Sequence, residues 1–150
     1  MDNSYSYTVT ADWTGPRKGV ASVKGITPEI TFSSPPEFKG ESGRWTPEHF
    51  LVAAVASCFV VTFHAIAEMS KLDFLSLQLA VEGKLGKPEG KLRFTEIVLS
   101  PVLTIYTEHD RERAARLLEK AEQGCLIARS LACPVSMQPQ TKIAEEVLAP

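Results

Sequence analysis

Apolar and polar residues alternate in three short segments of the first third of the chain. Residues 5–12 (YSYTVTAD) place aromatic and β-branched side chains at every second position, which is typical of a strand. The turn residues at 15–19 (GPRKG) predict that 20–24 pairs back as a hairpin, and 29–33 predicts a third strand. The proline- and glycine-rich segment 34–45 favours a loop over regular structure.

A long apolar segment follows this loop, and its first residues carry the signals of a helix start. Thr46 suits the N-cap, Pro47 the first helical position and Glu48 the positive end of the helix dipole. We expect the helix to run to about residue 71. Because its centre is apolar on nearly every side, we expect it to be buried on most of its faces.

The second half of the chain repeats the order of strands followed by a helix. The predicted elements are strands over 74–82 and 91–105, a helix over 108–124, a short helical segment over 125–131 and a last strand over 134–143. Pro101 favours a kink in the second of these strands, because proline has no backbone N–H to donate. This order predicts one α+β domain over residues 1–150 with a largely antiparallel sheet. A sheet from one chain of this size does not easily cover the long helix, so we expect a homodimer.

Composition narrows the classes of function. The net charge is −2 and no basic stripe is present, which argues against a nucleic-acid partner. The N-terminal residues lack the apolar core of a signal peptide. The apolar stretch over 50–67 is short and rich in Ala and Ser for a membrane span. We therefore expect a cytoplasmic protein without a membrane partner.

The cysteines are the side chains with the clearest chemical potential. The three cysteines are too few for a secreted disulfide scaffold and are not spaced like zinc ligands. Cys58 lies in the middle of the long helix and Cys125 near the end of the second helix. From its residue type alone, Cys58 could equally be a small hydrophobic core residue or a functional thiol.

Two charged residues favour thiol chemistry over a core role for the cysteines. The thiolate is the reactive form of cysteine, and the guanidinium of Arg17 would stabilise it if the two lie close together. Glu48 could hold that arginine in place. Each residue also has a plain interpretation, Arg17 as a solvated turn residue and Glu48 as a helix N-terminal acid.

These residues fall in a pattern that resembles a known family. Residues 46–58 (TPEHFLVAAVASC) resemble the helix that carries the first cysteine of the OsmC/Ohr family, the osmotically inducible and organic-hydroperoxide-resistance proteins. The turn at 15–19 looks like the Gly-Arg-x-Gly turn of that family, and 121–125 (AEQGC) is similar to the helix that delivers its second cysteine. The order of elements is similar over nearly the whole chain.

The resemblance implies a thiol peroxidase that uses no cofactor or metal. Cys58 would attack an organic hydroperoxide and become a sulfenic acid, which Cys125 would resolve as a disulfide. Arg17 would stabilise the thiolate and polarise the peroxide, and Glu48 would orient Arg17. A thiol or dithiol reductant would restore the enzyme. The family fold implies an intertwined homodimer with antiparallel sheets around long central helices.

Two further expectations concern the surroundings of the Cys58 thiol. An apolar wall that favours alkyl hydroperoxides over hydrogen peroxide is expected from Phe50, Leu51, Val55 and Phe59. Glu48 and Cys58 are separated by about 15 Å along the axis of one helix, too far for both to act on one arginine. We therefore expect Glu48 of one subunit to lie near Cys58 of the other.

The sequence leaves two choices open. Cys133 stands in a Cys-Pro-Val-Ser segment that resembles the surroundings of the second cysteine in many family members, whereas the position after the helix favours Cys125. The same fold could also serve as a non-catalytic redox sensor or small-ligand-binding module, or as a structural dimer with its cysteines in the core.

Overall fold

The computed structural model describes residues 3–145 of the chain. The chain forms two compact units, which correspond to Met1–Phe50 and Leu51–Pro150. Helix α1 (Pro47–Met69) begins in the first unit and continues through the second. The expectation of a single domain over residues 1–150 stays a prediction.

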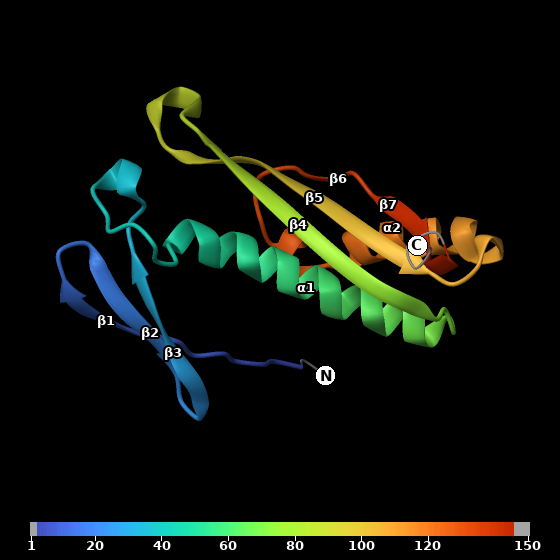
Figure 1. The fold of residues 1–150 in the computed structure, drawn as a ribbon. Helices are drawn as coiled ribbons and strands as arrows, with labels where there is room; N and C mark the ends of the chain where they lie inside the picture. Colours follow the sequence, from blue (N-terminus) through green and yellow to red (C-terminus); the bar gives the residue numbers. More distant parts are fainter. Residues whose placement is uncertain (1–2, 146–150) are drawn as a thin grey trace. The chain divides into compact units, whose positions relative to one another are not determined.

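The first unit contains an antiparallel sheet in the order β1-β2-β3 (Figure 1). Its elements are β1 (Thr10–Gly15), β2 (Lys18–Val23), β3 (Ile26–Ser33) and the short 3₁₀ helix η1 (Pro36–Phe38). The predicted strand over 5–12 is wrong at its start, because β1 begins at Thr10, opposite Ser22 of β2. Since β2 ends at the next residue, the residues before Thr10 have no strand to pair with in the described part of the chain.

Helix α1 starts where the sequence predicts. The backbone N–H of His49 donates to the hydroxyl of Thr46 at 3.1 Å, which is the hydrogen bond of an N-cap residue. Pro47 is the first helical residue. The helix ends at Met69, shortly before Lys71, whose left-handed backbone (φ 55°) is a common helix terminator.

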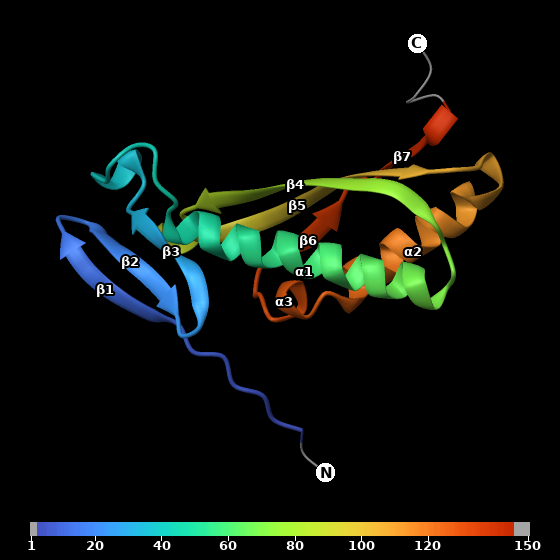
Figure 2. The same cartoon turned by 60° about the horizontal axis from the view of Figure 1, so that its bottom comes forward.

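The second unit is a sheet with helices on one face, as Figure 2 shows for α1 and α2. Its elements are β4 (Phe74–Gly86), η2 (Pro88–Gly90), β5 (Arg93–Ile105), η3 (Glu108–Asp110), α2 (Arg111–Gly124), α3 (Leu126–Arg129), β6 (Val135–Met137) and β7 (Gln140–Ile143). Strands β4 and β5 form a long antiparallel pair. Strands β6 and β7 both pair with β5, and both run parallel to it.

The last predicted strand, over 134–143, is divided into two strands. Strand β6 pairs with β5 at 97–99 and β7 pairs with it at 102–105. The break between them lies beside Pro101, which has no N–H to offer to a neighbouring strand. The kink expected at Pro101 is not found, because β5 continues through it and its register with β4 does not shift there.

The core of the second unit lies between the sheet and the helices. Fully buried side chains come from α1 (Val55, Phe59, Phe63, Ala67), α2 (Ala114, Leu118, Ala121) and β5 (Ile97, Leu99, Leu103, Ile105). The α1 residues recur at every fourth position and so form one face of the helix. Other apolar residues of α1 are exposed, Val61 at 65% and Met69 at 83%. Burial on most faces is thus not reached within one chain, and the homodimer that would supply it stays a prediction.

Helix α1 also has the length and apolar composition of a membrane-spanning helix. In the protein, 22% of its most apolar stretch is buried. Core helices of soluble proteins can have the same length and the same apolar composition, so this finding assigns no membrane location. The expectation that the protein has no membrane partner stays a prediction.

Candidate functional site

Cys58 lies at the edge of the buried face of α1. It directly precedes the fully buried Phe59, and its own side chain is half-buried. One helical turn further on, the hydroxyl oxygen of Thr62 lies 3.8 Å from the Cys58 sulfur. The helix therefore supplies a partly accessible thiol with a hydroxyl group beside it.

Cys125 lies at the junction between α2 and α3. Its extended backbone (φ −70°, ψ 107°) separates the two helices, and its side chain is fully buried. The Cys125 sulfur lies 4.0 Å from the carbonyl oxygen of Val55, which precedes Cys58 by about one turn of α1. The thiols of Cys58 and Cys125 are hydrogen-bonding neighbours, and both are free. The fold thus brings together two thiols that are distant in the sequence.

The hydrogen bonds around Cys58 favour its thiolate. Burial by itself raises the pKa of the Cys58 thiol. Hydrogen bonds from the backbone N–H of Ile127 and from the Cys125 thiol outweigh this effect, and the hydroxyl of Thr62 and the backbone N–H of Leu126 add to the lowering. The pKa of Cys58 therefore lies below its ordinary value, although no charged side chain of the second unit's described residues contributes to the lowering.

Cys125 has the opposite tendency. Burial raises the pKa of the Cys125 thiol, and the neighbouring Cys58 sulfur raises it further. The backbone N–H groups of Ala128 and Ile127 oppose this rise without reversing it. Cys125 therefore stays a thiol over a pH range in which Cys58 is a thiolate. Such a pair can take up an oxidising equivalent at Cys58 and then close a disulfide.

Arg17 lies in the turn between β1 and β2, with a left-handed backbone (φ 57°). Its side chain is exposed, and its guanidinium donates to the carbonyl oxygen of Phe38 at 3.2 Å. It borders an open cavity of about 360 Å³, whose lining also includes Trp13, Phe32 and Pro47. Arg17 thus presents a cation beside aromatic side chains of the first unit.

Glu48 lies in the first turn of α1. Its carboxylate oxygen Oε1 is buried and accepts no hydrogen bond from any group in the described residues. Arg17 and Glu48 form no ion pair within residues 3–50, where the guanidinium donates to the carbonyl oxygen of Phe38. Both residues belong to the first unit and the cysteine pair to the second, so a site that combines all four stays a prediction.

Cys133 is half-buried and packs against the core of the second unit, shortly before β6. The carbonyl of the next residue, Pro134, accepts a hydrogen bond from the N–H of Ile97 at 3.1 Å, which ties this segment to β5. In the part of the chain that the structure describes, Cys133 makes no hydrogen bond to the Cys58 sulfur. The thiol beside Cys58 is therefore that of Cys125.

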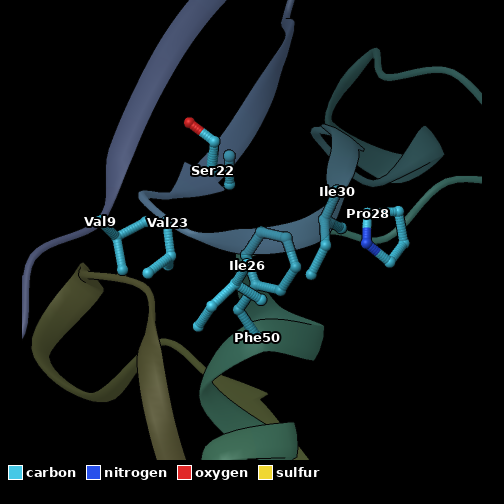
Figure 3. Close-up of a pocket in the computed structure, with 8 residues that line it drawn as sticks. Val9, Ser22, Val23, Ile26, Pro28, Ile30 and Phe50 are labelled. Atoms are coloured by element: carbon cyan, nitrogen blue, oxygen red, sulfur yellow. The ribbon is translucent and has the colours of Figure 1, made fainter.

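Two of the four residues expected to form an apolar wall, Val55 and Phe59, are not accessible. Val55 and Phe59 are fully buried in the core, so they cannot form an accessible wall. An apolar cavity of about 310 Å³ lies in the first unit instead, where Val23, Ile26 and Phe50 converge (Figure 3). A second cavity, of about 360 Å³, lies in the second unit and is lined by Val60, Val61, His64, Phe74 and Leu77.

Sequence reasoning misses three of the groups that contact the Cys58 sulfur, namely the hydroxyl of Thr62 and the backbone N–H groups of Leu126 and Ile127. Thr62 has a signal in the sequence, because residues four apart are neighbours on a helix. The backbone donors have no such signal, because every residue except proline carries an N–H, and only the packing of α3 brings these two to the thiol.

Comparison with known proteins shows which family and which solved structures the chain is similar to. The family model for OsmC-like proteins matches residues 40–140. An uncharacterised protein of Bacillus subtilis, YmaD, is 26% identical over 144 residues, which cover 93% of this chain and 95% of YmaD. Among solved structures, the chain is similar to an OsmC-like protein of unknown function from Vibrio cholerae (TM-score 0.81, 22% identity, 91% of this chain and 99% of that chain). It is also similar to an organic hydroperoxide resistance protein OsmC from Legionella pneumophila (TM-score 0.73, 21% identity, 95% and 100%). These likenesses confirm the predicted α+β fold class.

Proposed function

We propose a peroxidase function for this chain, which belongs to the OsmC-like protein family. Its substrate would be an organic hydroperoxide, as the name of the similar Legionella pneumophila protein suggests. The observation that carries the proposal is the pair of adjacent free thiols, in which the pKa of Cys58 is lowered and that of Cys125 is raised. The lower pKa makes Cys58 the first of the two to act as a nucleophile, and the neighbouring Cys125 can then resolve its oxidised form.

The first step oxidises Cys58. Its thiolate attacks the terminal oxygen of the hydroperoxide, so that an S–O bond forms and the O–O bond breaks. Cys58 becomes a sulfenic acid, and the alkoxide that leaves takes up a proton to become the alcohol. Two electrons have passed from the sulfur to the peroxide.

The second step closes a disulfide. The Cys125 thiol loses its proton and attacks the sulfur of the sulfenic acid, so that an S–S bond forms and hydroxide leaves as water. An external thiol or dithiol then supplies two electrons and two protons and restores both cysteines. Cys125 suits this role, because its sulfur already neighbours that of Cys58.

Arg17 and Glu48 would complete the site across a homodimer. The guanidinium of Arg17 would polarise the peroxide, and Glu48 of the other subunit would orient that guanidinium. The buried Oε1 of Glu48 supports this part of the proposal, because a buried carboxylate oxygen without a hydrogen bond is unfavourable. The exposed apolar residues of α1 support the homodimer, because a second subunit would remove their surface from water.

The test compares wild-type protein with Cys58→Ser in the consumption of an alkyl hydroperoxide in the presence of a dithiol. We expect Cys58→Ser to abolish consumption and the control Cys133→Ser to keep most of it. Full activity of Cys58→Ser would refute the proposal. Oxidation by a single equivalent of hydroperoxide without turnover would instead favour a redox sensor on the same fold.

A further inference from the structure

Thr62 holds its hydroxyl in an arrangement that is unusual for a threonine inside a helix. The hydroxyl of a helical serine or threonine commonly bonds the carbonyl four residues earlier. Ser57 does so on the same helix, with its hydroxyl 2.8 Å from the carbonyl oxygen of Ala53. In the described residues, the Thr62 hydroxyl makes no such bond to the carbonyl of Cys58 and faces the Cys58 sulfur at 3.8 Å.

The Thr62 methyl group lies on the side that faces the end of α2. A methyl group built on Gly124, the last residue of α2, would lie 3.8 Å from the Thr62 methyl, so the latter points toward that end of α2. The Cβ of threonine carries only one hydroxyl and one methyl, and χ1 sets both together. In the rotamer that turns the methyl toward Gly124, the hydroxyl lies beside Cys58.

We propose that Thr62 is a thiolate-stabilising residue of the peroxidase site, whose hydroxyl donates a hydrogen bond to the sulfur of Cys58. The inference rests on the proposed function in that Cys58 is the reactive thiol. A thiolate has no proton to donate, so Thr62 must be the donor once Cys58 ionises. The bond favours the thiolate over the thiol and fixes the sulfur next to Cys125.

The test must separate the effect of the Thr62 hydroxyl from the effects of the other groups around the Cys58 sulfur. Within residues 51–145, the titratable side chain that contacts Cys58 is Cys125, and the remaining donors are the backbone N–H groups of Leu126 and Ile127. None of these changes when Thr62 is substituted. A change in the ionisation of Cys58 therefore reports on the hydroxyl of Thr62.

The experiment measures the rate at which iodoacetamide alkylates Cys58 as a function of pH, with the modified peptide identified by mass. Thr62→Val keeps the shape of the side chain and removes the hydroxyl, whereas Thr62→Ser keeps the hydroxyl. Below the wild-type midpoint we expect Thr62→Val to react about three- to tenfold more slowly, because the bond is long for a charge-assisted one. Its rate at high pH should not fall, and Thr62→Ser should stay within about twofold of wild type throughout.

Three results would overturn the proposal: an unchanged profile for Thr62→Val, an equal slowing in Thr62→Ser, or a slowing of Thr62→Val by the same factor at every pH. Alkylation of Cys133 in the same samples serves as the reference for general changes in structure. If Thr62→Val does not fold, as judged by circular dichroism, Thr62→Ala against Thr62→Ser makes the same comparison. The assay contains no peroxide, so a failure of the proposed peroxidase activity leaves its result readable.

Discussion

The two units of the chain differ in how far their reactive groups are satisfied within one polypeptide. In the second unit, the sulfur of Cys58 has hydrogen-bond partners from α1, from Cys125 and from the start of α3. In the first unit, Arg17 bonds a main-chain carbonyl, and the buried Oε1 of Glu48 has no partner among the described residues. The second unit thus lowers the pKa of Cys58 with its own groups, whereas Oε1 of Glu48 has no donor among the described residues.

This difference separates two tasks that an arginine beside a thiol could perform together. Neutral donors already lower the pKa of Cys58 within the second unit. Under the proposed function, Arg17 is therefore needed for the peroxide, whose leaving oxygen gains negative charge, more than for the thiolate. The following predictions test whether these two tasks are carried out by different groups.

Among the variants that leave Cys58 in place, the largest effect is expected for Arg17→Ala. Hydroperoxide consumption should fall by about 100-fold or more, because a donor to the developing charge is lost. Alkylation of Cys58 by iodoacetamide should change by less than about threefold, because the thiolate keeps its neutral donors. The two rates are measured on the same preparation, with Lys18→Ala as the control for charge removal in the same turn. An equal fall of both rates would show that Arg17 stabilises the Cys58 thiolate and would contradict this prediction.

Glu48→Ala tests whether the carboxylate acts across two subunits. Consumption should fall by about 100-fold, because Arg17 would lose its orientation. Co-expression of Glu48→Ala with the inactive Cys58→Ser should recover activity, since each hybrid dimer would contain one complete site. Sedimentation should show a dimer. A monomer at assay concentration, or hybrids with no recovered activity, would contradict the shared site.

Cys125→Ser tests the pairing inside the second unit. Turnover with a dithiol should fall by about tenfold, because the sulfenic acid would wait for an external thiol. In wild-type protein, peptide mapping after one equivalent of hydroperoxide should find a disulfide between Cys58 and Cys125. Cys133→Ser is the matched control and should form that disulfide normally. A disulfide between Cys58 and Cys133 would assign the resolving role to Cys133.

The smallest effect is expected in the order in which Cys58 and Cys125 ionise as pH rises. The lowered pKa of Cys58 means that its thiolate forms at lower pH than that of a free cysteine, and the raised pKa of Cys125 means the reverse. As pH rises, alkylation of Cys58 should therefore reach its midpoint first. Midpoints rather than rates are compared, because burial also slows access to Cys125. A midpoint for Cys125 below that of Cys58 would reverse the proposed roles.

Much of the fold could be predicted from local sequence. The start of α1 follows from Thr46 and Pro47, whose capping and backbone preferences act within a few residues. The long strands of the second unit follow from alternation. The start of β1 could not be predicted in this way, because residues 5–9 alternate like a strand while β2 is too short to pair with them.

By itself, the sequence determined the order of the elements, the family resemblance and the two helices that deliver Cys58 and Cys125, because each depends on neighbours along the chain. Only the tertiary structure decided that Cys125 rather than Cys133 lies beside Cys58, and that Thr62 and two backbone N–H groups surround its sulfur. Spacing in a sequence does not specify distances between elements, and every residue except proline carries the same backbone N–H donor. The acidity of a thiol depends on which donors reach it, and packing alone brings them there.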